Sequence, residues 1–172
     1  MSDYAVLLSG GDLRSIGKSN FIVQRINKQQ AFDELFHCLC HQDRKVVMRA
    51  ADAIEKISIA KPKFLSKHTS TLLKLLNRAE NKELKWHLAQ IIPRLSLTAK
   101  ETNLVFKIFS SWLVYEKDSR IVRVTALQAL SDLSANNTQL RKELFDLIRH
   151  KDLTAIPSLK ARLKKLSFKT ST

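Results

Sequence analysis

A sixteen-residue pattern recurs four times in this sequence, and no other feature constrains the fold as strongly. The first three copies begin 38 residues apart, and the fourth begins 33 residues after the third. A regular period of this length is typical of stacked helical units, which bury their apolar surfaces only against their neighbours. The copies are Asp43–Ser58, Asn81–Ser96, Ser119–Ser134 and Asp152–Ser167.

Each copy has the spacing of one face of an α-helix. In the first copy, Val46, Ala50, Ile54 and Ile57 follow one another at steps of four, four and three residues. These steps bring apolar side chains onto a single helical face. The spacing therefore predicts motif helices near 43–58, 81–96, 119–134 and 152–167. Side chains able to cap the first helical turn open the copies, namely Asp43, Asn81, Ser119 and Asp152.

A second apolar stretch precedes each copy, so each unit is predicted to be a helical hairpin. We expect an all-α fold, a right-handed α-solenoid of about four hairpins. The repeats would occupy residues 31–168, after an N-terminal capping segment at 1–30 and before a tail at 169–172. The additional apolar stretches are Phe32–Cys40, Phe64–Leu76, Leu104–Val114 and Leu140–Ile148.

The segment Asp43–Ile57 resembles the second helix of a HEAT repeat. Asp43 matches the turn aspartate of that family, Arg49 matches its basic position, and Ala50 and Ile54 match its core positions. The resemblance extends over residues 31–168, and the chain is similar to small bacterial HEAT-repeat (HEAT/armadillo-like) proteins. It implies a non-catalytic interaction module or scaffold that binds a macromolecular partner over its concave face.

The later copies depart from this pattern. His87 and Thr125 stand in the column of Arg49, so the aspartate–arginine pairing typical of the family is predicted to be discontinuous. Pro93 is predicted to kink the second motif helix, because proline lacks a backbone donor. Pro157 lies early in the fourth copy, which is therefore either a truncated cap or a helix that begins late.

The positive charge is concentrated in the repeats. The formal net charge is +14, and residues 1–42 contribute none of it. A basic solenoid attracts anions such as an acidic protein, nucleic acid or a lipid surface. We expect the partner to be anionic, for example an acidic protein. It would contact polar and basic positions of the motif helices. The candidates are Arg49, Lys56, His87, Gln90, Arg94, Gln128 and Lys165.

Two other functions remain open. Direct nucleic-acid binding fits the charge, although the aromatic residues mostly fall at core-like spacing and stacking platforms are not evident. A HEAT-like alkylpurine DNA glycosylase is the third hypothesis, and the resemblance to that class rests on Trp86, Trp112, Asp52 and Asp132. No other catalytic arrangement is present in the sequence, so we expect a non-catalytic protein without a cofactor.

The segment Gly10–Ser19 (GGDLRSIGKS) is a candidate anion site. It has one residue too many before its Gly-Lys pair to match a Walker phosphate loop. Its glycines would still permit a backbone nest, with Arg14 and Lys18 holding the anion. The alternative is a plain turn that leads into a helix near Asn20–Asn27.

The run His37–His41 (HCLCH) is a candidate metal site, with His68 as a ligand from elsewhere. Its Cys-x-Cys spacing is not one of the usual zinc spacings, and cysteine is a common buried residue in helix packing. We therefore predict no metal ligand in this chain.

No apolar run is long enough for a membrane span, and the first residues lack the pattern of a secretory signal. Cys38 and Cys40 are too close for a comfortable helix disulfide. These features predict a reducing, cytoplasmic location, and we expect the protein to be a monomer.

Overall fold

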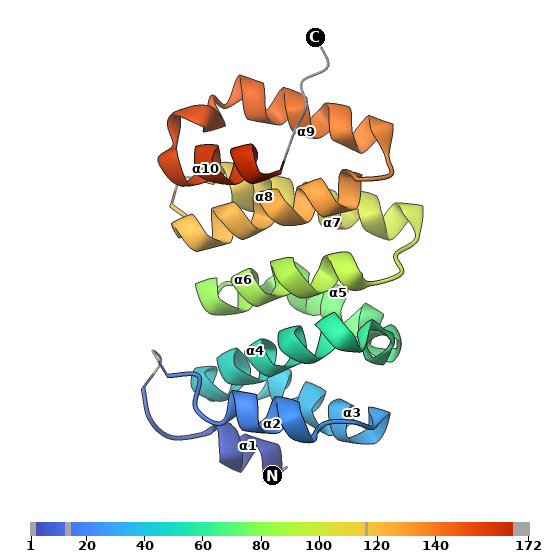
Figure 1. Cartoon of the computed structure of the whole chain (residues 1–172), viewed down its shortest axis with the longest axis vertical. Coiled ribbons are helices and arrows are strands. Elements are labelled where there is room, and N and C mark those ends of the chain that lie inside the picture. Colours follow the sequence, from blue (N-terminus) through green and yellow to red (C-terminus); the bar gives the residue numbers. More distant parts are fainter. Residues whose placement is uncertain (1–2, 13–14, 116, 167–172) are drawn as a thin grey trace. The chain divides into compact units, whose positions relative to one another are not determined.

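The computed structural model describes residues 3–12, 15–115 and 117–166. Over these residues the chain forms α-helices and short 3₁₀ helices without any strand (Figure 1), which confirms the all-α prediction. The chain divides into two compact units, Met1–Leu72 and Leu73–Thr172, whose boundary falls within α5 (Thr69–Arg78). Among the described helices, none is both long and apolar enough to cross a bilayer.

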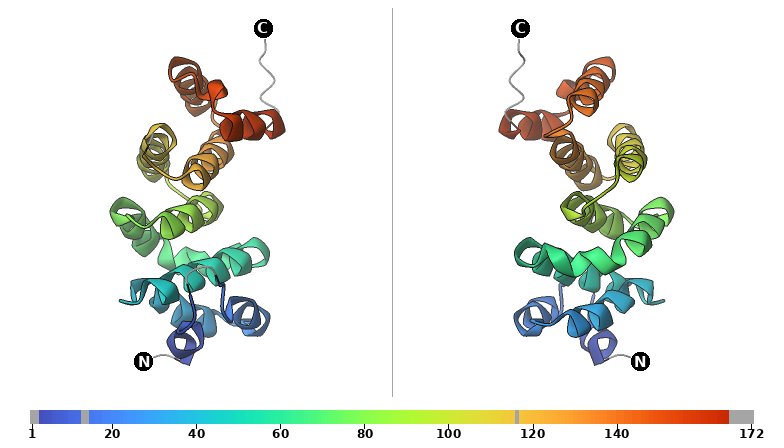
Figure 2. Two further views of the ribbon diagram at one scale, coloured as in Figure 1. Left: turned by 90° about the vertical axis from the view of Figure 1, so that its left-hand side faces the viewer. Right: turned by 90° about the vertical axis from the view of Figure 1, so that its right-hand side faces the viewer.

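The described part of the first unit is built mainly from two pairs of helices. These helices are α1 (Asp3–Leu8), α2 (Ser19–Arg25), α3 (Gln29–His37) and α4 (Arg44–Ala60). α2 packs along α4, and α1 contacts both α3 and α4 (Figures 1 and 2). The N-terminal segment, predicted as a cap, therefore contains two short helices, each of which contacts α4.

The first motif copy forms α4 as its spacing predicts. Asp43 is the N-cap and accepts a hydrogen bond from the Lys45 backbone N–H at 2.8 Å. Val46, Ala50 and Ile54 are fully buried, and the alanine lets neighbouring backbones approach closely. Two 3₁₀ helices flank α4, namely η1 (Cys38–Cys40) and η2 (Pro62–His68).

The described part of the second unit begins with the end of α5 and continues with further helices that pack around α8. Its helices are α6 (Lys82–Ile91), α7 (Ala99–Val114), α8 (Arg120–Ser134), α9 (Thr138–His150) and α10 (Pro157–Lys165). α8 is central and contacts the other four (Figure 2). The motif helices α6, α8 and α10 thus form one layer, which buries Leu88, Ala126 and Leu159, the residues that correspond to Ala50 of the first copy.

The second motif copy gives a shorter α-helix than predicted. α6 ends at Ile91, and the chain continues as the 3₁₀ helix η3 (Ile92–Arg94). Pro93 has no backbone N–H to continue the α-helical bonding pattern, so a tighter turn follows. Pro93 therefore lies where the α-helix gives way, rather than at a kink within a continuing helix.

The fourth motif copy begins later than its alignment predicts, which settles the choice between a truncated cap and a late helix. Asp152 does not cap the helix, because it adopts a left-handed conformation with φ 43°. The chain then forms the 3₁₀ helix η4 (Leu153–Ala155), and α10 starts only at Pro157. Ala155, which corresponds in the fourth copy to the buried Val46 of the first, is consequently exposed.

Candidate interaction surface

Arg49, a predicted partner contact, lies in the interior of the first unit. Its side chain is 1% exposed although its guanidinium is permanently charged. Backbone carbonyl oxygens of the last residue of α1 and of the segment that follows it accept its hydrogen bonds. Nε donates to Ser15 at 2.9 Å, and Nη2 donates to Asp12 at 2.8 Å. Nη1 donates to Leu8 at 2.7 Å, to Ser9 at 3.2 Å and to Gly10 at 2.6 Å.

This position removes Arg49 from the candidate partner contacts. Turning the guanidinium outward would leave its carbonyl partners unsatisfied, which costs about 1–3 kcal/mol per buried polar group. Arg49 therefore holds the N-terminal loop in place within its own unit, and its charge does not form part of the exposed surface.

The loop around Arg49 has the opposite polarity to an anion nest. Its carbonyl oxygens point at a cation, whereas an anion site needs inward N–H groups. All three glycines of the loop adopt positive φ, which allows the backbone to wrap closely. Lys18 is exposed beside the loop, and Arg14 lies outside the described residues. The bonds to Arg49 favour the plain turn over the anion site.

Lys56, another predicted contact, ties α4 to the start of α2. Its Nζ donates to the Asp52 carboxylate at 2.7 Å and to Asn20 Oδ1 at 2.8 Å. The fully buried Ser19 hydroxyl also donates to Asp52. The Lys56 ammonium thus has partners within the first unit, although 34% of its side chain remains exposed.

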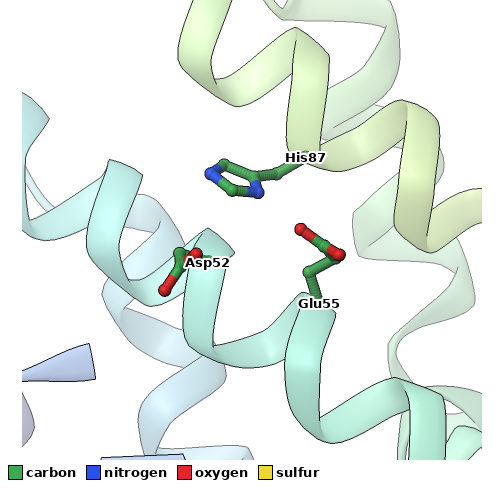
Figure 3. A group of neighbouring side chains, drawn as sticks. All are labelled: Asp52, Glu55 and His87. Atoms are coloured by element: carbon green, nitrogen blue, oxygen red, sulfur yellow. The ribbon is translucent and has the colours of Figure 1, made fainter. Parts of the chain in front are cut away.

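His87 is a second predicted contact that is buried, with 2% of its surface exposed. It lies on α6 of the second unit, and its ring stacks on Trp86 at a centroid separation of 4.6 Å. Figure 3 shows this ring together with Asp52 and Glu55, which both lie on α4 of the first unit. Burial removes His87 from the candidate partner contacts.

Packing and hydrogen bonds account for two of the residues on which the glycosylase hypothesis rests, Trp112 and Asp52. Trp112 is buried edge-on against Phe109, with 5.4 Å between ring centroids. Asp52 is hydrogen-bonded within the first unit, and Asp132 belongs to α8 of the second. Trp112 therefore contributes to core packing, and Asp52 joins α2 to α4 through its hydrogen bonds.

The remaining predicted contacts lie on the motif-helix layer of the second unit. Two further polar residues, Arg162 and Asp132, were not among the predicted contacts and are hydrogen-bonded to one of them, Gln128. Arg162 Nη1 donates to Gln128 Oε1 at 3.1 Å, and Gln128 Nε2 donates to Asp132 Oδ1 at 2.8 Å. We call the group the motif-helix strip. It consists of Gln90 on α6, Arg94 on η3, Gln128 and Asp132 on α8, and Arg162 and Lys165 on α10.

Every residue of the motif-helix strip is partly or fully accessible to solvent. The strip has three cations, Arg94, Arg162 and Lys165, and one carboxylate, Asp132. It also lies in the more basic unit, since residues 73–172 account for +10 of the formal net charge of +14. The strip is therefore an exposed cationic surface with a single internal counter-charge.

Asp132 is the electrostatic centre of the strip. Desolvation by its surroundings raises the pKa of its carboxyl group, while the hydrogen bond from Gln128 and the positive charges of Arg94 and Arg162 oppose this rise. The net shift of this pKa is upward. The carboxylate is thus partly desolvated by its neighbours, although the residue as a whole is exposed.

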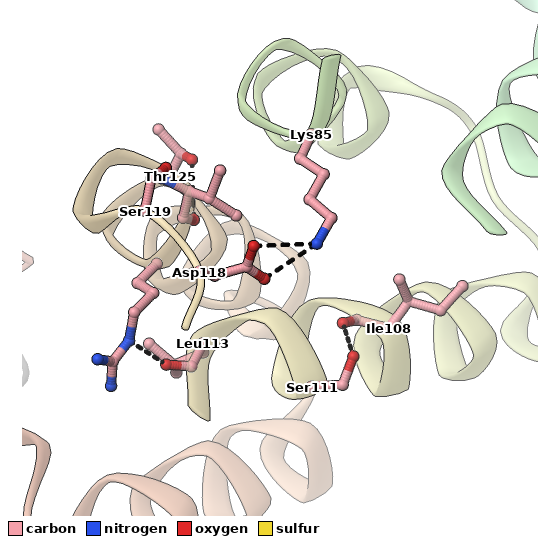
Figure 4. Close-up of polar contacts among 9 residues, drawn as sticks. Lys85, Ile108, Ser111, Leu113, Asp118, Ser119 and Thr125 are labelled. Atoms are coloured by element: carbon pink, nitrogen blue, oxygen red, sulfur yellow. Dashed lines mark hydrogen bonds and ion pairs between the residues drawn. The ribbon is translucent and has the colours of Figure 1, made fainter. Parts of the chain in front are cut away.

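Lys85 and Asp118 form a separate ion pair between α6 and the turn before α8 (Figure 4). Lys85 Nζ lies 3.0 Å from both carboxylate oxygens, and the side chains are only 13% and 11% exposed. The ammonium also lies 5.3 Å from the ring centroid of Trp112. The later repeats lack the arginine of the aspartate–arginine pairing that is typical of the family. In this part of the chain the Lys85–Asp118 pair links successive repeats instead.

The His and Cys residues of the candidate metal site have separate surroundings. Cys38 is buried. His41 Nδ1 accepts a hydrogen bond from the Asp43 backbone N–H at 3.0 Å. His68 Nε2 lies 2.6 Å from Asp33 Oδ1. These bonds occupy one ring nitrogen of each histidine in the packing of the first unit.

A family model described as a HEAT repeat domain matches residues 12–167 of this chain. No curated protein and no solved structure matches it. The matched region begins before α2, so it includes the helix that sequence reasoning assigned to a cap outside the repeats.

Proposed function

Because the chain belongs to the HEAT repeat family, we propose that it is a non-catalytic interaction module that binds an acidic segment of a partner protein. HEAT repeats generally serve as scaffolds for protein interactions. The proposed contact surface is the motif-helix strip of the second unit.

The arrangement of Arg162, Gln128 and Asp132 carries this proposal. Their two hydrogen bonds connect α10 with α8 and hold polar groups in fixed positions at an accessible surface. Partly buried guanidinium groups suit recognition of carboxylates, because their planar donors can form two parallel hydrogen bonds. A fixed cationic surface therefore favours an acidic peptide over a neutral one.

The distribution of charge supports the same partner. The second unit carries most of the net positive charge of the chain. Charge complementarity of this kind raises association rates and selects partners by sign. The interaction should weaken with salt, because exposed charges are screened over about 8–10 Å at moderate ionic strength.

Fluorescence anisotropy with a labelled peptide rich in Glu and Asp tests the proposal. We expect binding at low salt, and a loss of about tenfold or more in affinity for the double variant Arg94→Glu/Arg162→Glu. The matched control is Arg141→Glu/Lys142→Glu, which makes the same change in charge at exposed positions of α9. Equal losses in both variants would mean that overall charge, and not the strip, governs binding.

Direct nucleic-acid binding is a second candidate function, favoured by the exposed basic residues Arg141, Lys142 and Arg149 on α9. Labelled duplex and single-stranded DNA in the same assay distinguish it. A phosphate-binding surface would show a steep salt dependence and would be weakened by the α9 double variant. We do not propose a DNA glycosylase, because Asp52 and Trp112 are accounted for by hydrogen bonding and packing.

We also propose a cytoplasmic location and a monomeric state. The free thiols of Cys38 and Cys40 support a reducing compartment. Sedimentation of the full chain with and without the acidic peptide tests the monomeric state, since a single species with the chain mass of 19.7 kDa is expected.

A further inference from the structure

We propose that Asp132 is an internal competitor that occupies the position of a partner carboxylate on the motif-helix strip. The proposal deepens the proposed function and rests on it. Its ligand class is an acidic peptide, one carboxylate of which replaces the Asp132 carboxylate beside the two arginines.

The geometry places one carboxylate among donors and cations. Gln128 Nε2 donates to Asp132 Oδ1 at 2.8 Å, while its Oε1 accepts from Arg162 Nη1 at 3.1 Å. Gln128 therefore relays between the guanidinium and the carboxylate. The positive charges of Arg94 and Arg162 both act on the Asp132 carboxyl. A carboxylate in this position accepts a hydrogen bond from the Gln128 amide and is attracted by the positive charges of Arg94 and Arg162.

Exposure makes this carboxylate exchangeable. Asp132 lies at an exposed position of α8, so its side chain can turn to solvent without opening the core. Asp118 provides the contrast, because its carboxylate is only 11% exposed and lies 3.0 Å from Lys85 Nζ. The nearly buried Lys85–Asp118 pair is part of the packing between successive repeats. The exposed carboxylate of Asp132 can instead be displaced by a carboxylate of the ligand.

Charge balance predicts the effect of removing the competitor. With Asp132 ionised, one internal negative charge offsets the attraction of Arg94 and Arg162 for an incoming carboxylate. Asn at position 132 keeps nearly the same shape and an oxygen that accepts from Gln128, but it has no charge. The positive charges of the two arginines would then attract an acidic peptide without the opposing charge of Asp132, and the affinity of the peptide should rise about three- to tenfold.

The test measures binding of a labelled Glu- and Asp-rich peptide to the full chain by fluorescence anisotropy. The variants are Asp132→Asn and, as a matched control, Asp146→Asn, which removes one carboxylate from α9 of the same unit. We expect tighter binding for Asp132→Asn by about three- to tenfold, and an affinity within about twofold of the native protein for Asp146→Asn. A Gln-substituted peptide should not distinguish the variants.

Two outcomes would overturn the proposal in different ways. Equal gains for Asp132→Asn and Asp146→Asn, or no gain for either, would remove the role of Asp132 while leaving the binding surface intact. Failure of the peptide to bind any variant at low salt would instead overturn the proposed function itself. Circular dichroism of each variant ensures that a change in affinity reflects the strip and not a loss of helix.

Discussion

Gly17 lies directly against the guanidinium of Arg49, so that a Cβ atom at Gly17 would stand 3.0 Å from Arg49 Nε. Gly17 also has a φ of +55°, which residues with a side chain rarely adopt. Two independent requirements, one of conformation and one of space, therefore specify glycine at this position.

Gly17→Ala should destabilise the protein by about 2–4 kcal/mol, because it combines left-handed strain with contact against Arg49. Urea unfolding followed by circular dichroism measures the change. Gly10→Ala is the matched control, since Gly10 has a φ of +75° but no neighbouring atom within 4 Å of the place where a Cβ would stand. It should cost only about 1–2 kcal/mol. Equal losses for the two variants would show that contact with Arg49 contributes nothing.

Arg49→Lys should also be destabilising, by about 2–4 kcal/mol, although it keeps the charge. A lysine ammonium has three donors at one point and cannot reach the carbonyl oxygens that the planar guanidinium meets from several sides. Urea unfolding and limited proteolysis of the N-terminal loop measure the effect. Arg44→Lys, at an exposed position of the same helix, should change stability by less than about 0.5 kcal/mol. Wild-type stability in Arg49→Lys would contradict the role of the guanidinium.

The Asp33–His68 pair makes the stability of the first unit sensitive to acid. Desolvation raises the pKa of Asp33, but hydrogen bonds from Gln29 and His68, with the charges of His68 and Lys67, bring it below its ordinary value. Because the folded pKa is depressed, the stabilisation is present above the unfolded pKa and is lost as pH falls through the folded value.

Urea unfolding at about pH 6 and about pH 3 tests this dependence. The native protein should lose more stability between these conditions than Asp33→Asn, which lacks the titrating carboxylate. Asp146→Asn, on α9, should behave like the native protein. An identical pH dependence in the native protein and Asp33→Asn would exclude a contribution from the pair.

The Lys85–Asp118 pair should be worth more than an exposed pair. Removing one partner leaves a nearly buried charge, so Asp118→Asn should cost about 2–4 kcal/mol. The double variant Lys85→Met/Asp118→Asn should recover part of that loss, as a double-mutant cycle would measure. Breaking the exposed Arg149–Asp146 pair, whose arginine is 79% exposed, should cost less than about 1 kcal/mol. Similar losses at both pairs would contradict the importance of burial.

Much of the fold was predictable because its signals are local. The apolar steps and the N-caps Asp43 and Ser119 specify α4 and α8 within a residue or two of their observed bounds. The start of the fourth motif helix was harder to predict, because the copy aligns from Asp152 whereas α10 begins at Pro157. A proline favours the first turn of a helix, and Leu159 is buried as its place in the repeat predicts.

The candidate surface was less predictable, because burial depends on distant parts of the chain. Arg49 bonds to carbonyl oxygens that lie 34 to 41 residues earlier, and a backbone carbonyl has no sequence signature. His87 looks outward by its column but is buried in the structure. Lys56, Gln90, Arg94, Gln128 and Lys165 remain predictions of partner contact. They lie where the helical period places accessible polar residues.

The convergence of the loop carbonyls on Arg49 also sets an order of events during synthesis. A chain leaves the ribosome from its N-terminus, so the residues whose carbonyls bond to Arg49 emerge before it, and these carbonyls stay hydrated in the meantime. The leading segment therefore lacks its final form until a later helix has been made. A nascent chain arrested before Arg49 would present this segment to proteases and chaperones as unfinished.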